Sequence, residues 1–248
     1  MRFARSAAHV HSDWSYDGTW TLDELAAAFR RRRYAAILLS EHDRTFDADR
    51  WAGYREACAR ASRGILLVPG IEYSNADNTV HTLVWGPREF LGRGLPTADL
   101  VASAREQGGV AVLAHPDWKG AAARLDRAML AALDGVEWWN RRYDGLAPSA
   151  AAARLGVAAT PYVGLDFHTR RQFFPLAMRI GVDGALTPEA VFGALRARDA
   201  RAEAGHTGVE RLARGAPLQA LRAADRAKDA AITASRPARR AWRSARER

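Results

Sequence analysis

The segment AAILLSEHD, Ala35–Asp43, joins an apolar run to a group of polar and ionisable residues. Its first part, Ala35–Ser40, lacks the strict alternation of a strand with one face in water, so we interpret it as a strand covered on both faces. His42 follows directly after this strand. A buried strand that delivers a histidine at its carboxyl end is the pattern from which we predict both the fold and the site.

The same pattern recurs along the chain. Helix signals lie between the apolar runs, since Thr21 and Glu24 form a capping box and Thr187 precedes Pro188 at a helix start. Repeated strand–helix alternation favours parallel strands joined by crossover helices. The seven or eight strands predict an α/β fold that suits a barrel, with an open sheet as the alternative. The further predicted strands are Ala4–Val10, Ile65–Pro69, Val80–Trp85, Val110–Ala114, Gly135–Trp139, Tyr162–Leu165 and Ala177–Val182.

Length and composition are consistent with one domain. The chain has 248 residues, 48% of them hydrophobic, which suits a single α/β barrel of roughly 250 residues. Cys58 is the only cysteine, so no internal disulfide forms and a cytoplasmic location is our default expectation. The N-terminus resembles no signal peptide, and no apolar run is long enough to cross a membrane, so we expect no membrane partner.

The net charge of +9 is concentrated at the C-terminal end. Residues 211–248 contain 11 Arg/Lys and 3 Asp/Glu, a charge of +8, whereas the remaining 26 Arg/Lys and 25 Asp/Glu leave residues 1–210 at +1. We therefore divide the chain into a hydrolase barrel, 1–204, and a helical basic C-terminal extension, 205–248. The extension is either a solvated tail without a ligand or a contact for nucleic acid.

Histidines and carboxylates gather where the predicted strands end. Carboxyl ends of parallel strands meet at one rim, and residues spaced i, i+2, such as His9 and His11, point to the same side. Imidazole and carboxylate groups bind Zn, Mn or Fe ions. Nine such ligands exceed the needs of one ion, so we predict two to three divalent ions. The candidate ligands are His9, His11, Asp17, His42, Glu72, His81, His115, Asp166 and His168, of which His81 lies at the start of a predicted strand instead of its end.

Five motifs in order resemble those of the PHP family, the polymerase and histidinol phosphatase domains. They are HVHSDWSYDG (His9–Gly18), SEHD (Ser40–Asp43), GIEYS (Gly70–Ser74), AHPD (Ala114–Asp117) and GLDFH (Gly164–His168). The resemblance runs from about residue 4 to about residue 204. It implies a distorted (β/α)7 barrel, a metal site that is usually trinuclear, and phosphoesterase activity. It also implies that the nine candidate ligands bind the metals and that Glu72 bridges two ions.

Residues beside the motifs are candidates for binding substrate. Arg141, Arg142, Arg170 and Arg171 lie just past strand ends, where guanidinium groups fit phosphate oxygens, and we expect one or two of them to reach the substrate. The alternative is that they are solvated loop charges, and Lys119 is a weaker candidate of the same kind. Trp14 and Trp118 either stack on a base or sugar ring or pack in the core.

These patterns favour a metal-dependent phosphoric ester hydrolase. We expect a phosphate monoester of a small molecule, or a nucleotide, to be attacked by a hydroxide that bridges two ions, with Glu72, Asp166 and His168 serving catalysis. A nuclease acting on nucleic-acid ends is one alternative. A non-catalytic metal-binding regulatory module is another, of a different class.

Overall fold

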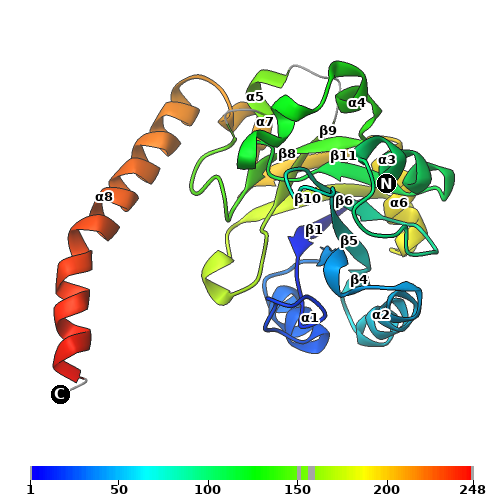
Figure 1. Ribbon diagram of the computed structural model, residues 1–248, viewed down its shortest axis with the longest axis horizontal. Coiled ribbons are helices and arrows are strands. Elements are labelled where there is room, and N and C mark those ends of the chain that lie inside the picture. The colour runs from blue at the N-terminus through cyan, green and yellow to red at the C-terminus, as the bar shows by residue number, and fades with distance from the viewer. Residues whose placement is uncertain (1, 150–151, 156–159, 247–248) are drawn as a thin grey trace.

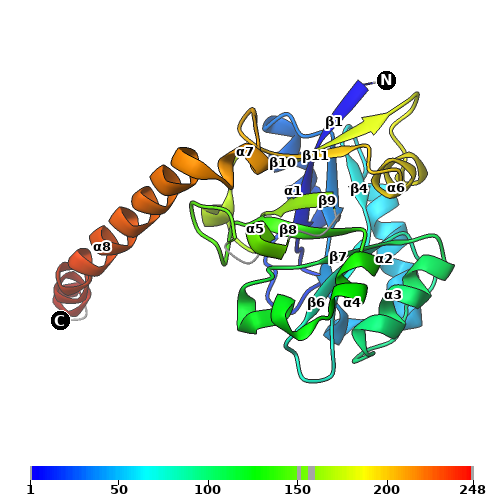
Figure 2. The ribbon, with the colours of Figure 1, turned by 90° about the horizontal axis from the view of Figure 1, so that it is seen from above.

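The chain folds into a mixed α/β body from which one long helix extends (Figure 1). The structure is a computed structural model and describes residues 2–149, 152–155 and 160–246. In both ribbon views the helix α8 (Gly215–Arg246) runs away from the body (Figures 1 and 2). The predicted α/β class is confirmed, and each of the eight predicted strands coincides with an observed strand.

The strands belong to two six-stranded sheets. The first has the order β12-β11-β10-β1-β2-β4 and consists of β1 (Arg2–Val10), β2 (Ala36–Leu39), β4 (Leu66–Val68), β10 (Leu176–Val182), β11 (Ala200–Ala204) and β12 (Thr207–Gly208). The second has the order β3-β5-β6-β7-β8-β9 and consists of β3 (Glu41–His42), β5 (Gly70–Ser74), β6 (His81–Trp85), β7 (Val110–Leu113), β8 (Gly135–Asn140) and β9 (Thr160–Gly164).

The strands form two sheets and not the single closed barrel sheet that we predicted. Short connections link the two sheets. Ser40 alone separates β2 from β3, and Pro69 alone separates β4 from β5. Beyond the end of β9, Leu165 N donates to Ala8 O at 3.0 Å. Past this point the two segments pair only through an isolated bridge between Val10 and Phe167, and His9 and Asp166 have left-handed φ angles of 56° and 48°, which distort a regular ladder.

Among the described strands, β6, β10 and the short β12 run against the direction expected from an all-parallel arrangement. β6 is antiparallel to both β5 and β7, and β10 is antiparallel to both β1 and β11. A parallel connection needs a crossover of about a dozen residues, whereas only residues 75–80 join β5 to β6. The prediction of exclusively parallel strands is therefore wrong. The start of β6 lies at the same end of the sheet as the carboxyl ends of its neighbours.

Helices cover the outside of the strands, and their start signals act as predicted. The Thr21 side chain accepts from Glu24 N while the Glu24 carboxylate accepts from Thr21 N, which begins α1, and Leu25 and Phe29 of this helix are buried. Thr187 caps α6 with Pro188 in its first turn. The helices are α1 (Leu22–Arg31), α2 (Ala48–Ala61), α3 (Thr97–Glu106), α4 (Arg127–Ala132), α5 (Ala152–Leu155), α6 (Pro188–Arg196) and α7 (Val209–Leu212), with 3-10 turns η1 (Asp43–Thr45), η2 (Trp118–Arg124) and η3 (Arg170–Gln172).

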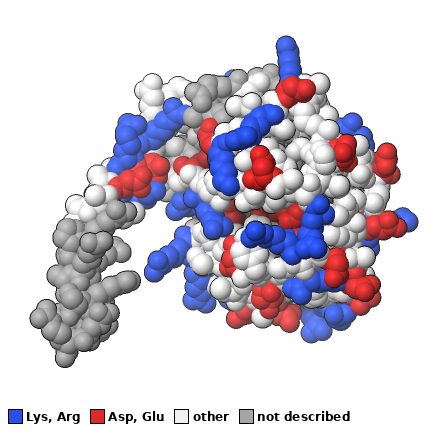
Figure 3. Space-filling view, in the orientation of Figure 1, with Lys and Arg blue, Asp and Glu red and all other residues white. Residues whose placement is uncertain are grey.

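The C-terminal segment first packs on the body and then leaves it. Val209 is buried, and Asp225 of α8 accepts from Leu146 N at 3.1 Å. Side chains from Arg236 onward lie outside the described part of the chain, so the predicted basic character of the tail's end rests on the sequence. Acidic and basic side chains are interspersed over the body in Figure 3. Among the described residues, no helix combines the length and apolarity that a membrane crossing requires.

Candidate metal centre

Glu72 lies at the centre of a buried cluster of histidines. It projects from β5 and is almost inaccessible to solvent. The histidines come from four other segments, and each offers a ring nitrogen to one of the two carboxylate oxygens. Oε1 lies 2.7 Å from His81 Nδ1 and 2.9 Å from His115 Nε2, while Oε2 lies 3.2 Å from His42 Nδ1, 3.4 Å from His9 Nε2 and 3.5 Å from His11 Nε2.

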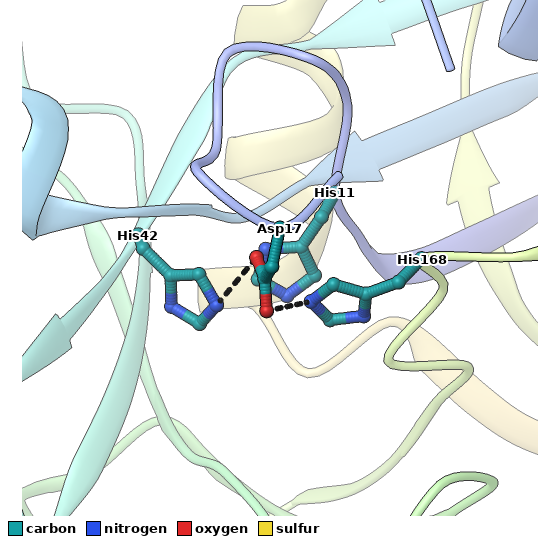
Figure 4. A group of neighbouring side chains, drawn as sticks. All are labelled: His11, Asp17, His42 and His168. Carbon is teal, nitrogen blue, oxygen red and sulfur yellow. Dashed lines mark ion pairs between the residues drawn. The ribbon is translucent and has the colours of Figure 1, made fainter. Parts of the chain in front are cut away.

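Asp17 forms a second focus, where its carboxylate lies between His42 and His168 (Figure 4), and it is only partly buried. Its Oδ1 lies 3.3 Å from His42 Nε2, and its Oδ2 lies 3.1 Å from His168 Nε2. Burial opposes ionisation, but the neighbouring His168 and His42 rings hold the pKa of Asp17 below its usual range. Asp17 is therefore a carboxylate at neutral pH and can serve as an anionic ligand.

The ligand atoms fall into three overlapping groups, within each of which all atoms lie within 4.8 Å of one another. His81 stands outside these groups but contacts Glu72 directly. All nine residues selected from the sequence therefore come together. The groups are His11, Asp17, His42 and His168; His9, Glu72 and His115; and His9, His11 and Asp166.

Strand direction explains this convergence. His9 and His42 lie at the ends of β1 and β3, and His115 follows the end of β7 by two residues. His81 is the first residue of β6, and because β6 is antiparallel its start reaches the same rim. A histidine at the start of a strand, which conflicted with the pattern of the other ligands, thus fits the site.

Three ligand residues adopt left-handed backbone conformations. The φ angles are 56° at His9, 26° at His115 and 48° at Asp166. Such conformations cost non-glycine residues of order 1–3 kcal/mol each and persist where surrounding structure enforces them. Their concentration at one rim indicates that the backbone there is arranged to aim side chains rather than to continue strands.

The residues present fit divalent metal ions. Eight buried side-chain atoms in the described part of the chain make no hydrogen bond, and five of these belong to the candidate ligands. Buried polar atoms are normally paired, so this concentration of free lone pairs requires an explanation, and bound cations would supply one. The five atoms are His9 Nε2, His11 Nε2, Asp17 Oδ1, His42 Nε2 and His115 Nδ1.

Residues behind the ligands orient two of the histidines. His9 Nδ1 donates to Glu137 Oε1 at 2.9 Å, which leaves Nε2 facing Glu72 and Asp166. The Ser15 hydroxyl donates to Glu41 at 2.6 Å, so its oxygen accepts from His11 Nδ1, 3.2 Å away. Both contacts favour the tautomer whose Nε2 lone pair points into the cluster.

Sequence reasoning missed these supporting residues. Glu137 lies inside the apolar strand GVEWWN and is buried, where it also accepts from His115 N at 2.8 Å. A single carboxylate within an apolar run was the available signal. Glu41 is buried beside His42 and accepts hydrogen bonds from Ser12, Ser15 and Tyr54.

The two histidines of the first motif differ electrostatically. Burial disfavours the charged form of His9, but Glu137, Asp166 and Glu72 together raise its pKa well above the ordinary value. Burial and the neighbouring histidines lower the pKa of His11 well below it. His9 therefore holds its proton to a higher pH than His11, so metal binding at His9 competes more strongly with protons.

Of the six predicted substrate-binding residues, Arg142 and Trp118 lie at the cluster. Arg142 donates to Asp166 Oδ1 at 3.2 Å. Trp118 lies 4.5 Å from His81 between ring centroids, and the Lys119 ammonium lies 4.2 Å from the Trp118 ring centre. Tyr143 and Tyr16, which sequence reasoning missed, lie 4.7 Å from His115 and 5.0 Å from His42 between ring centroids.

The other four predicted substrate-binding residues make no described contact with the cluster. The Arg141 guanidinium lies over Phe174, and that of Arg170 lies over Trp20. Trp14 packs against Tyr54 and Phe46 beneath Arg50, in agreement with the core-packing alternative. Arg171 is exposed, and no described contact joins it to the cluster.

Comparison with known proteins identifies the fold. A two-domain protein from Bacteroides vulgatus that contains a predicted PHP-like metal-dependent phosphoesterase is 20% identical, with a TM-score of 0.62 over 83% of this chain and 66% of that one. This chain has the PHP-like fold. PsfC from Pseudomonas syringae is 17% identical, with a TM-score of 0.63 over 86% of this chain and 95% of that one.

An amidohydrolase from Chromobacterium violaceum with bound sulfate and no metal is 20% identical, with a TM-score of 0.51 over 82% of this chain and 98% of its own. The chain spans slightly less than two thirds of the length of the Bacteroides protein. No protein-family model matches the sequence, and neither does any curated protein. The comparisons identify a PHP-like fold, and the clustered side chains could hold metal ions.

Proposed function

We propose that the protein hydrolyses a phosphate monoester of a small molecule or nucleotide. The observation that carries this proposal is the set of nine histidines and carboxylates around Glu72, next to the cationic Arg142. The PHP-like phosphoesterase domain of the Bacteroides protein supports the same reaction class.

The chain's own residues would hold the metals and the phosphoryl group. Two to three Zn, Mn or Fe ions, when bound, supply an acidified water and positive charge for the phosphoryl oxygens. Glu72 offers an oxygen to each of two groups of histidines and so suits a bridging position. Asp166 and His168 would hold metal on the side of the cluster nearest Arg142. The remaining N–H groups of Arg142 are available to a phosphate oxygen.

Aromatic side chains at the rim favour an ester with a flat organic portion. The exposed large hydrophobic residues of the described chain are Tyr16, Tyr143 and Ile232, and both tyrosines contact candidate metal ligands. Trp118 lies 6.0 Å from Tyr143 between ring centroids. A sugar or base attached to the phosphate could stack on these rings, which supports a nucleotide as one substrate.

A nuclease acting on nucleic-acid ends is the second candidate. The +8 charge of residues 211–248 favours it, because arginine and lysine bind backbone phosphates. A metal-binding regulatory module without turnover would use the same ligands but would not require the cation and aromatic rings at the rim.

The deciding experiment compares hydrolysis of a monoester, a diester and a short oligonucleotide by full-length protein, with and without Mn²⁺. Glu72→Gln, which keeps the side-chain shape but removes the charge, should lose most activity and bound metal while circular dichroism stays unchanged. Preferential monoester turnover supports the proposal, and preferential release of terminal nucleotides supports the nuclease. If metal-loaded wild-type protein turns over none of the three substrates, the result supports the regulatory module and contradicts the proposal.

A further inference from the structure

A cavity of about 550 Å³ lies between α2, α6 and the turn from β6 into the next helix. Its wall includes Leu66 at the start of β4, Gly86 just after β6 and Gly108 just before β7. These positions are at the opposite end of the strands from the ligands, because the ligand at the start of β6 is His81. The five residues of β6 span roughly 15 Å, so the cavity and the metal centre are separate places.

The cavity carries an excess of positive charge. Arg55, Arg88 and Arg196 line it, together with a single carboxylate, Glu189. None of the three arginines takes part in an ion pair among the described residues. A guanidinium keeps its charge at any physiological pH and carries five N–H donors, so uncompensated arginines around a cavity attract an anion.

Hydrogen bonds fix two of these guanidinium groups while leaving donors free. Arg55 donates through one terminal nitrogen to Arg88 O at 2.9 Å, and Arg196 donates to Gly108 O. Gln107 Oε1 accepts from Arg88 N and Glu89 N, at 3.0 and 3.1 Å, which anchors the loop that carries Arg88. Less conformational freedom is therefore lost when an anion binds.

Apart from the polar residues Ser62 and Gln107, the rest of the lining is apolar. Phe192 contributes an aromatic ring, and a Cβ added at Gly86 would lie 3.6 Å from this ring, so the ring lies close above the glycine. Trp51 and three proline rings, Pro69, Pro87 and Pro188, also line the cavity. The volume falls in the range of small-molecule sites, roughly 300–1,000 Å³.

We propose that this cavity binds a small organic anion with a flat apolar body, such as an aromatic or heterocyclic carboxylate, sulfonate or phosphate. The ring system would lie against Phe192 and the prolines, with the anionic group among Arg55, Arg88 and Arg196. The cavity and the metal centre share strands, because Leu67 and Pro69 precede Glu72 and Gly86 follows the strand that starts at His81. Occupancy of the cavity would therefore contact the strands that hold two metal ligands.

The test uses the fluorescent anion 8-anilinonaphthalene-1-sulfonate with full-length, metal-loaded protein. Arg88→Gln and Arg196→Gln each remove a charge from an exposed side chain. Each should raise the dissociation constant of the fluorescent anion about tenfold, as expected for losing a hydrogen bond to a charged group. Ala59→Trp on α2 should abolish saturable binding by filling the cavity while all three arginines remain. Thermal melts check that each variant is folded, because this probe also binds partly unfolded protein.

Two control variants separate the cavity from other sites. Arg31→Gln removes an exposed charge from α1, away from the cavity, and should leave binding within twofold of wild type. Glu72→Gln should also leave it unchanged, since the metal centre is not involved. The proposal is overturned if folded wild type shows no saturable binding, if Arg88→Gln, Arg196→Gln and Ala59→Trp all bind normally, or if Glu72→Gln abolishes binding.

Discussion

Glu137 Oε1 lies 2.9 Å from His9 Nδ1, although the two residues are 128 positions apart in the sequence. Both side chains are fully buried, and the second oxygen of Glu137 accepts from His115 N and Asn140 Nδ2. One carboxylate thus fixes the ring of one candidate ligand and the backbone of another. Such contacts behind a metal ligand commonly change metal affinity by about 10–100-fold when removed.

Glu137→Gln should therefore weaken metal binding by about 10–100-fold while leaving the nine ligands in place. The amide oxygen can still accept from His9, but the negative charge that makes this histidine a better ligand is lost. Calorimetric titration of the metal-free variant with Mn²⁺ measures the effect. Glu89→Gln, an exposed residue, is the control and should bind metal normally. An unchanged affinity for Glu137→Gln would restrict Glu137 to a packing role.

Gly164→Ala should destabilise the fold because Glu137 occupies the space that a side chain would need. A Cβ at this position would lie 1.8 Å from Glu137 Oε1 and 2.8 Å from His9 Cβ. Overpacking of this kind costs about 1–3 kcal/mol, which urea unfolding can resolve. Gly193→Ala is the matched control, since a Cβ there meets no atom within 4 Å and the residue lies in α6. It should raise stability by about 0.5–1 kcal/mol.

Protein purified without chelator should contain two to three equivalents of Zn, Mn or Fe. The reason is that three groups of ligand atoms overlap within one cluster and share His9 and His11. Elemental analysis of the protein gives the stoichiometry, and chelation followed by Mn²⁺ addition tests whether it is restored. A content well below one equivalent that added metal does not raise would contradict the assignment of the cluster.

Arg142→Ala should lower kcat/KM for a phosphate monoester by about tenfold or more, as expected when a hydrogen bond to a charged group is lost. Arg142 is the predicted arginine that contacts Asp166 and the His168 ring. Arg170→Ala provides the comparison, because its guanidinium lies over Trp20 instead. Steady-state kinetics on both variants distinguish the two positions, and equal losses would mean that Arg142 has no special relation to the substrate.

Removal of residues 215–248 should leave monoester hydrolysis within about twofold of wild type, because every candidate ligand precedes α8. The truncation follows Arg214 so that the buried residues Val209 and Ala213 remain. If α8 recruits nucleic acid, oligonucleotide binding should weaken and its salt dependence should flatten, since each contact with a phosphate releases counterions. Unchanged oligonucleotide binding excludes that role, and lost monoester activity in folded protein would show that α8 helps to form the site.

The sequence by itself determined eight of the twelve described strands and the metal-ligand candidates, but it did not predict β3, β5, β11 or β12. Apolar runs and helix caps are local signals, so β2, β7 and α1 could be placed from neighbouring residues alone. Most of the ligands were recognisable because histidines and carboxylates recur after strand ends in the sequence, whereas His81 lies at the start of its strand.

Only the tertiary structure decided the direction of β6, the pairing of Glu137 with His9, and the choice of Arg142 over Arg141. Each depends on which distant segments meet. Adjacent arginines after β8 have equal charge and similar neighbours, yet one contacts Asp166 and the other lies over Phe174. The periodicity of apolar residues along a chain indicates which residues are buried. The contacts of a buried or partly buried group depend instead on strand order and on backbone angles such as those of His9 and Asp166. Long-range packing imposes both of these.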